Sequence, residues 1–311
     1  MPYITGTFSN GNDYKKLITK RTRVLRMYQE DAKARSTFSL LNLSNLSQVE
    51  NIEEIIFSST TLLNQDHLND IAKCMNLKTL HLGTRIDLDF SVLENTNIEE
   101  LVVYCNCNCD PHQSIMSLQK LKKLSIRFFD IEKEQVASEN NKSISHRLGT
   151  AVKSLFGLAK NPEPQIPLMH QSLDLLPASI HYLSIDGPVT DFDLADLDHL
   201  KLQRLGLSRL LECELKFSVE MAKNLEVLTI TGCENIGQFS SIPFRNSTRL
   251  NTLNFKGTGW HWIDMTGFAG LKSLRTVLMT DTINIYISDK ETTKILSPGL
   301  KVFNDEIGEF Y

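Results

Sequence analysis

A six-residue pattern, apolar-x-x-apolar-x-apolar, recurs nine times in this chain of 311 residues. The nine copies begin at Ile52, Leu77, Ile98, Leu121, Ile180, Leu202, Leu225, Leu250 and Leu274. Successive starts lie 25, 21, 23, 59, 22, 23, 25 and 24 residues apart. A period in this range is the signature of stacked supersecondary units. The repeat therefore predicts one elongated stack, although the length alone would permit two compact domains.

Each copy predicts a short strand with two unlike faces. Positions 4 and 6 of the pattern are apolar and alternate to one face, whereas positions 3, 5 and 7 point to the other. One strand cannot bury its apolar face alone, but stacked copies form a parallel sheet that can. Apolar residues such as Phe268 and Leu271 precede the next copy at turn-like or helical spacing. We therefore expect an α/β solenoid with an outer layer of helices or turns.

The pattern resembles the leucine-rich repeat family over about residues 38–311. Residues 225–233, LEVLTITGC, are similar to its cysteine-containing subtype, and residues 176–183, LPASIHYL, are similar to the repeats of bacterial effectors. The resemblance implies a curved horseshoe with a parallel concave β-sheet and helices or 3₁₀ turns on the convex side. It implies about nine or ten repeats, with degenerate copies expected at Leu300 and at 40–43. Family members place Asn or Cys at position 9.

Residues 1–37 are predicted to form a separate basic helical cap. The first 40 residues carry a net charge of +5, which leaves −9 on the rest of a chain whose total is −4. Apolar side chains at Tyr14, Leu17, Leu25 and Tyr28 indicate an amphipathic helix over 13–34. One interpretation is a cap over the first repeat. The other is a basic helix that contacts an anionic lipid surface or nucleic acid.

The 59-residue step indicates an insertion at about 130–178. Within it, apolar residues on one face predict a helix over about 143–160, with Ser143 as its N-cap. Residues 161–167 are rich in proline and predict an extended linker. The helix either packs on the convex side or forms an arm that docks on a partner.

Few residues indicate chemistry. Cys105, Cys107 and Cys109 form a possible soft-ligand set, but alternate residues of a strand lie too far apart for one ion, so no metal is expected. Trp260 falls at a core position, and Trp262 is a candidate for the surface. No phosphate-binding glycine loop or catalytic triad is evident. We therefore expect neither a cofactor, an enzyme activity nor a small-molecule substrate.

Cellular location follows from weaker signals. The six cysteines are sparse, no apolar run is long enough to span a membrane, and the first residues do not resemble a secretory signal. We expect a cytoplasmic protein or, if it is a bacterial effector, one translocated into the host cytosol without a classical signal peptide.

The functional prediction is a non-catalytic module that binds another protein through its concave face and the inserted arm. Charged and aromatic side chains cluster on the outward positions of the first repeats: Glu54, His81, Glu100, Val102, Tyr104, Lys123, Arg127, Tyr182, Asp186 and Arg204. Tyrosine and arginine are favoured anchors of protein interfaces. The module is expected to be monomeric apart from its partner and to act as an adaptor or effector that inhibits or recruits a partner enzyme. The alternative is a peripheral membrane or nucleic-acid binder that uses the basic helices.

Overall fold

The computed structural model describes most of the chain, and the structural statements below concern those residues. They are 2–8, 11–27, 38–58, 61, 63–83, 88–106, 112–129, 173–189, 193–211, 213–233, 236–258, 260, 262–268, 270–279, 284–286 and 301–304. The helix predicted over 143–160 and the linker over 161–167 lie outside them.

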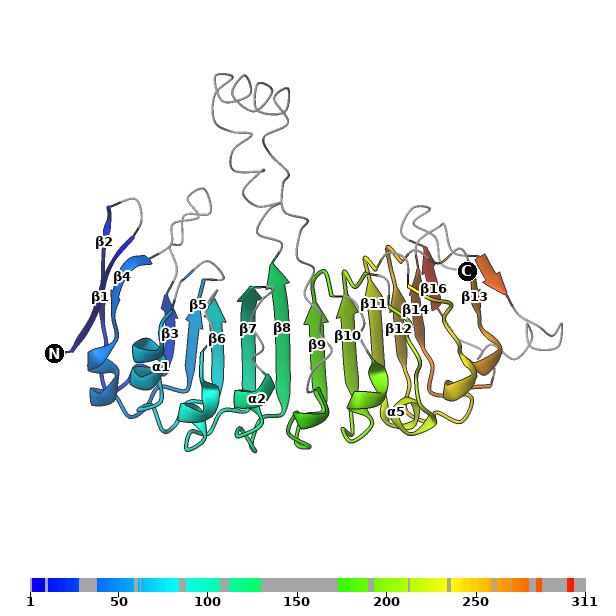
Figure 1. Cartoon of the computed structure of the whole chain (residues 1–311), viewed down its shortest axis with the longest axis horizontal. Helices are drawn as coiled ribbons and strands as arrows, with labels where there is room; N and C mark the ends of the chain where they lie inside the picture. Colours follow the sequence, from blue (N-terminus) through cyan, green and yellow to red (C-terminus); the bar gives the residue numbers. More distant parts are fainter. Residues whose placement is uncertain are drawn as a thin grey trace, which may run out of the picture.

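One parallel sheet of eleven strands runs the length of the molecule, in the order β16-β14-β12-β11-β10-β9-β8-β7-β6-β5-β3 (Figure 1). Its strands are β3 (Val24–Met27), β5 (Glu54–Phe57), β6 (Thr79–Gly83), β7 (Glu100–Asn106), β8 (Lys123–Phe129), β9 (Tyr182–Asp186), β10 (Arg204–Ser208), β11 (Val227–Thr231), β12 (Thr252–Phe255), β14 (Thr276–Met279) and β16 (Lys301–Asn304). Equivalent positions pair: Leu101 lies opposite Leu124, and Leu124 opposite Leu183. The ladder therefore continues across the insertion, and the predicted leucine-rich repeat solenoid is confirmed.

The two faces of the sheet differ in burial, because successive side chains of a strand point to opposite faces. In β8, Leu124 and Ile126 are completely buried, whereas Lys123 and Arg127 are exposed. Burying a leucine side chain contributes roughly 2 kcal/mol relative to leaving it in water. Because each strand buries these side chains only when its neighbours are present, stacking holds the fold together. We call the side formed by positions 3, 5 and 7 the open face.

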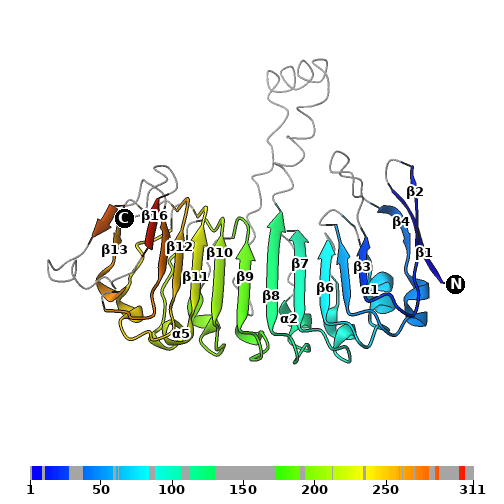
Figure 2. The ribbon, with the colours of Figure 1, turned by 180° about the vertical axis from the view of Figure 1, so that it is seen from behind.

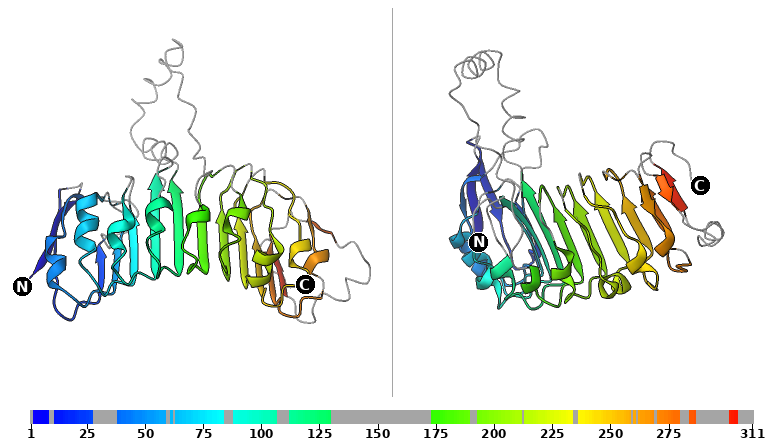
Figure 3. Two further views of the ribbon diagram at one scale, coloured as in Figure 1. Left: turned by 60° about the horizontal axis from the view of Figure 1, so that its bottom comes forward. Right: turned by 45° about the vertical axis from the view of Figure 1, so that its right-hand side comes forward.

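Short helices and 3₁₀ turns form the second layer. They are η1 (Ser44–Gln48), α1 (Gln65–Ile71), η2 (Phe90–Leu93), α2 (His112–Ile115), η3 (Leu173–Leu175), η4 (Leu194–Leu197), α5 (Val219–Asn224), η5 (Ile242–Phe244) and η6 (Thr266–Phe268). Aspartates begin two of these turns, because Asp89 accepts from the Ser91 N–H and Asp193 from the Ala195 N–H. Figures 2 and 3 show the strands on the inner side of the curved stack and this layer on the outer side.

Asparagines just before the pattern join the first repeats to one another. The Nδ2 groups of Asn51, Asn76 and Asn97 donate to the carbonyls of Lys20, Glu50 and Met75 at 2.6, 2.7 and 2.8 Å. Each carbonyl belongs to the preceding repeat, so one amide per repeat satisfies a backbone acceptor of its neighbour. A side-chain ladder of this half thus lies one residue before the pattern.

The helix predicted over 13–34 is wrong wherever the structure describes it. Residues 13–17 form β2 (Asp13–Leu17), which joins β1 (Tyr3–Phe8) and β4 (Phe38–Asn42) in a separate antiparallel sheet of order β2-β1-β4. The Phe8 ring stacks on Phe38 at 4.4 Å between ring centroids, and the Tyr14 ring meets both edge-on. These aromatic contacts stabilise the antiparallel strands. A helix over the same residues would lack this tertiary packing, from which most helices in proteins gain their stability.

The main sheet also begins earlier than predicted. β3 pairs in parallel with β5, and Leu25 and Met27 are completely buried opposite Ile55 and Phe57. The two strands β2 and β3, separated by a turn at 18–23, together produced the spacing that resembles a helix. Figure 1 shows the small antiparallel sheet at the N-terminal end of the stack.

Two degenerate copies also differ from the prediction. Residues 40–43 are not a repeat of the main sheet, because β4 pairs antiparallel with β1. A unit does exist near Leu300, but β16 places Val302 and not Phe303 opposite Val277. Its register is therefore one residue earlier than the pattern beginning at Leu300.

Candidate partner-binding face

The ten predicted site residues lie on the open face of six consecutive strands, β5 to β10. Position 3 forms one continuous row, in which Glu100, Lys123, Tyr182 and Arg204 stand opposite one another in register. Their neighbours at positions 4 and 6 are buried in every one of these strands. The sequence pattern thus places these side chains on one surface.

Seven of the ten residues surround a hollow of about 560 Å³ in this face. The hollow is lined by His81, Glu100, Val102, Lys123, Ser125, Arg127, His181, Tyr182, Gln203 and Arg204. Glu54, Tyr104 and Asp186 lie outside the lining. We call this site the central hollow.

Small side chains occupy position 5 of the strands at the central hollow. Ser125, Ser184 and Gly206 follow one another across β8, β9 and β10. A Cβ atom on Gly206 would lie 3.3 Å from the Ser184 Oγ, so even a methyl group would crowd this row. Longer side chains at position 3 stand beside this row, and Ser125 is the member of the row that lines the hollow.

His181 and Gln203 complete the lining and were not among the predicted site residues. Each occupies position 2, immediately before its strand, and the Gln203 N–H donates to the His181 carbonyl at 2.8 Å. The pattern assigned positions 3, 5 and 7 to the open face. Extending the exposed set by one residue toward the start of each strand would have included both.

One acidic residue, Glu100, serves two basic neighbours. The Lys123 Nζ lies 3.1 Å from one Glu100 carboxylate oxygen, and the His81 Nε2 lies 3.7 Å from the other. The His81 Nε2 is shielded from solvent and has no hydrogen-bond partner among the described residues. Glu100 on β7 is therefore engaged by side chains of both neighbouring strands, His81 of β6 and Lys123 of β8.

Arg127 is held by a neutral partner. Its Nη1 donates to the Tyr104 hydroxyl at 3.2 Å, and its guanidinium lies 5.4 Å from the centre of the Tyr104 ring. The two side chains are opposite each other at position 7 of β7 and β8. A neutral tyrosine orients the guanidinium without neutralising its positive charge.

Asp186 has a different environment from the rest of the predicted site. Its carboxylate accepts from the Nε of Arg209 at 2.6 Å. Arg209 follows β10 and has a φ of 59°, a conformation uncommon for a residue with a side chain. Asp186 thus ties the end of β9 to the turn after β10.

The described cysteines are core residues. Cys74, Cys213 and Cys233 are buried, and burial raises the pKa of Cys74 and Cys233 to about 11 each, so these thiols stay protonated at neutral pH. The described residues contain no group of three or more metal-binding side chains. The predictions for the thiols of Cys105, Cys107 and Cys109 concern side chains outside the described set.

Trp260 is a core residue, as predicted. Its side chain is 5% exposed, packs against Phe239 and Phe255, and donates from Nε1 to the Gly237 carbonyl at 2.8 Å. The side chain of Trp262 lies outside the described set, although its backbone begins β13 (Trp262–Asp264), which pairs with β15 (Asn284–Tyr286). No helix in the described ranges is long and apolar enough to cross a membrane.

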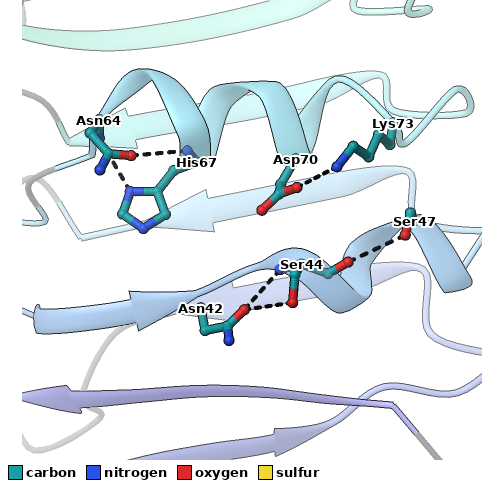
Figure 4. Close-up of polar contacts among 7 residues, drawn as sticks. All are labelled: Asn42, Ser44, Ser47, Asn64, His67, Asp70 and Lys73. Carbon is teal, nitrogen blue, oxygen red and sulfur yellow. Dashed lines mark hydrogen bonds and ion pairs between the residues drawn. The ribbon is translucent and has the colours of Figure 1, made fainter.

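A second hollow, of about 640 Å³, lies between the small antiparallel sheet and α1. His67 fixes one wall: its Nδ1 accepts from the Asn64 N–H at 3.2 Å and its Nε2 donates to the Leu41 carbonyl at 2.9 Å. Asn64 in turn accepts from the His67 N–H, which closes a capping box at the start of α1 (Figure 4). These bonds fix the helix against the sheet, so the polar groups of this wall have a structural role.

Comparisons with known proteins find solved structures whose architecture is similar to that of this chain. No family model matches the chain, and no curated protein matches its sequence. An internalin from Listeria monocytogenes is 17% identical, with a TM-score of 0.41, over 85% of this chain and 75% of that one. Internalin C2 of the same species is 17% identical, with a TM-score of 0.39, over 85% and 84%. A leucine-rich repeat protein of Leptospira interrogans is 16% identical, with a TM-score of 0.36, over 84% and 74%.

Proposed function

We propose that this chain is a non-catalytic protein-binding module whose partner docks on the open face of β5 to β10. The observation that carries the proposal is the central hollow, whose lining brings together Tyr182, Arg127 and Arg204. Residues of these types in a partly enclosed site supply most of the binding energy in protein interfaces. The rest of the sheet provides a rigid support, since its strands are fixed in register on both sides.

Binding is favoured over catalysis by the arrangement of the polar groups. Ser125 is the only serine or threonine in the lining of the central hollow. In the described structure no hydrogen bond joins its hydroxyl to His81 or His181. The Nδ1 of His181 lies 3.3 Å from the Ser179 carbonyl of its own segment. A nucleophile needs a base within hydrogen-bonding reach, and this site supplies none among its described lining residues.

Inhibition of a partner enzyme is the finer role that we propose. It is supported by the similarity of residues 176–183 to bacterial effector repeats. Ser179 of that segment also has a structural role, because its hydroxyl donates to the Leu121 carbonyl at 2.7 Å. A partner enzyme whose active site lies under the open face would lose activity when the chain is added.

Affinity capture from a cytosolic lysate tests the proposal. The triple variant Tyr104→Ala/Arg127→Ala/Tyr182→Ala is expected to lose the partner that the unaltered chain retains. The matched control, Val227→Ala/Thr252→Ala/Thr276→Ala, alters position 3 of β11, β12 and β14 and is expected to retain it. If the folded triple variant keeps every partner, the proposed face is wrong. Adding the chain to the captured enzyme in an activity assay then separates inhibition from recruitment.

The inserted segment belongs to the same proposal. Residues 130–178 follow β8 directly, and β8 forms part of the central hollow. Deleting residues 143–160 is expected to weaken capture of the partner without unfolding the sheet. Unchanged capture would remove the segment from the binding surface and leave the open face as the proposed site.

A further inference from the structure

The central hollow carries an excess of positive charge. Its lining contains Lys123, Arg127 and Arg204 against a single carboxylate, that of Glu100. The chain as a whole has a net charge of −4, so this excess is a local feature and not a reflection of composition. Because Lys123 pairs with Glu100, the uncompensated charges are the two guanidinium groups.

The two arginines of the hollow have no ion-pair partner among the described residues, whereas some arginines outside it do. Arg249, immediately before the copy that begins at Leu250, pairs with Glu226, and Arg209 pairs with Asp186. Arg127 instead contacts the neutral Tyr104 hydroxyl, and Arg204 is exposed with no ion-pair partner among the described residues. Arg26, Arg245 and Arg275 also have no ion-pair partner among the described residues, but the central hollow brings two such arginines to one concave site.

The acidic residues nearest to the hollow do not compensate these charges. Asp186 stands opposite Arg127 in the register of β8 and β9, but its carboxylate pairs with Arg209 at 2.6 Å and forms no ion pair with Arg127 in the described structure. Glu54, on β5, lies outside the lining and is separated from Glu100 by β6. An incoming carboxylate therefore meets two guanidinium groups and the Tyr182 ring between Lys123 and Arg204.

We propose that the central hollow binds an acidic segment of the partner protein through carboxylates that pair with Arg127 and Arg204. This inference rests on the proposed function. A guanidinium presents a planar fork that matches a carboxylate, and such charge-assisted pairs are among the stronger hydrogen bonds. Five strands spaced by about 4.8 Å span about 19 Å, which accommodates an extended segment of roughly six residues.

A protein partner fits the charges better than a polyanion does. Binding to nucleic acid typically neutralises about six to ten phosphates, whereas the hollow offers three cations. The overall charge of −4 repels an extended anionic surface at long range. A short acidic segment needs only the local excess.

Selection from a displayed library of random dodecapeptides on the immobilised full chain tests the inference. We expect the enriched sequences to contain more Asp and Glu than Lys and Arg. A synthetic peptide of the most enriched sequence should bind roughly tenfold more weakly to Arg127→Ala/Arg204→Ala. It should bind within about twofold of the unaltered affinity to Arg245→Ala/Arg275→Ala, which removes the same charge from two exposed arginines elsewhere. The version with Gln in place of Glu and Asn in place of Asp should not bind.

Several results would overturn the inference. They are enrichment of neutral or basic sequences, no enrichment, or equal affinity for the double variant. Competition by inorganic phosphate or by phosphatidylserine vesicles at the same arginines would identify a phosphate or membrane site instead. Failure here is distinguishable from failure of the proposed function. If the triple variant loses its captured partner but no acidic peptide is selected, the face binds protein and only the acidic chemistry is wrong.

Discussion

The two halves of the open face share one backbone and differ in what they present. From β6 to β10 the outward positions carry Glu, Lys, Arg, Tyr and His around the central hollow. From β11 to β14 positions 3 and 5 carry Val227, Thr252, Thr276, Thr229 and Asn254 among others, which are half-exposed and mostly small and polar. Because the register is the same throughout, the difference comes from the outward residues alone. In this solenoid, scaffold and surface are set by separate positions of one pattern.

The interiors of the two halves also differ. The second half contains a cluster of aromatic rings centred on Phe239, which packs against Phe217, Phe244, Phe255, Trp260 and Phe268. The first half is mainly aliphatic inside, and its asparagines bond each repeat to the preceding one. The half without the proposed site thus has the bulkier core.

The largest effect is expected from Phe239→Ala. This side chain is 1% exposed, and its removal should lower the free energy of unfolding by about 3–5 kcal/mol, because the cavity cannot be filled by rigid neighbouring rings. Urea denaturation followed by circular dichroism measures the loss. Phe239→Leu, which keeps much of the volume, should lose less. A loss below about 1 kcal/mol for the alanine variant would show that the cluster does not hold the second half together.

The second prediction concerns buried thiols, for which we expect the same pH dependence of stability in both halves. Burial raises the pKa of Cys74 in the first half and Cys233 in the second to about 11, with the Asp70 carboxylate contributing at Cys74. The unfolded thiols titrate near 8.5–9. Between about pH 9 and 11 the unfolded state therefore binds fewer protons, and stability should fall by up to about 1.4 kcal/mol per pH unit for each thiol.

Denaturation across this pH range checks the thiol prediction. Cys74→Ala and Cys233→Ala should each show a shallower decline of stability with pH than the unaltered chain. Rapid reaction of the native chain's Cys74 or Cys233 with a thiol reagent at pH 8 would contradict their buried, protonated state.

A smaller effect is expected from Asn76→Ala and Asn97→Ala. Each removes a hydrogen bond between repeats of the first half, so each should cost about 1 kcal/mol in urea denaturation. Asn95→Ala is a suitable control, because its amide contacts only the neighbouring Glu94 side chain. If Asn76→Ala and Asn97→Ala were as stable as Asn95→Ala, the hydrogen bonds of the asparagine amides would contribute nothing to the stacking of the repeats.

The smallest effect on stability is expected on the open face itself. Arg204→Ala and Thr252→Ala, at position 3 of β10 and β12, should each change the free energy of unfolding by less than about 0.5 kcal/mol. Only Arg204→Ala should weaken partner binding. If Arg204→Ala destabilises the fold by more than about 2 kcal/mol, the residue is structural and the functional contrast between the halves is lost.

The pattern predicted the interior better than the surface. Positions 4 and 6 are buried wherever a regular copy was recognised, because burial of an apolar ladder depends only on spacing. The N-terminal segment was misassigned because Tyr14 and Leu25 lie on two separate strands. Taken together along the sequence, the apolar residues of these strands have the spacing of a helix. Only the contacts of Tyr14 with Phe8 and Phe38, made through tertiary packing, distinguish the two.

The candidate site was predictable as a face but not as a hollow. A small residue at position 5, such as Ser125 in the lining, gives no sequence signal until charged neighbours surround it. The pairing of Asp186 with Arg209 was also hidden, since it depends on the left-handed turn at Arg209. Long-range pairing of side chains requires the backbone path, which the pattern does not specify outside the strands.

Site-specific photocrosslinking tests the central claim most directly. A benzoylphenylalanine placed at Tyr182 or at Thr252 samples position 3 in the two halves of the same sheet. In lysate that contains the captured partner, we predict a covalent adduct with the partner from position 182 and none from position 252. Adducts of equal yield from both positions, or an adduct from position 252 alone, would contradict a partner site confined to the first half of the open face.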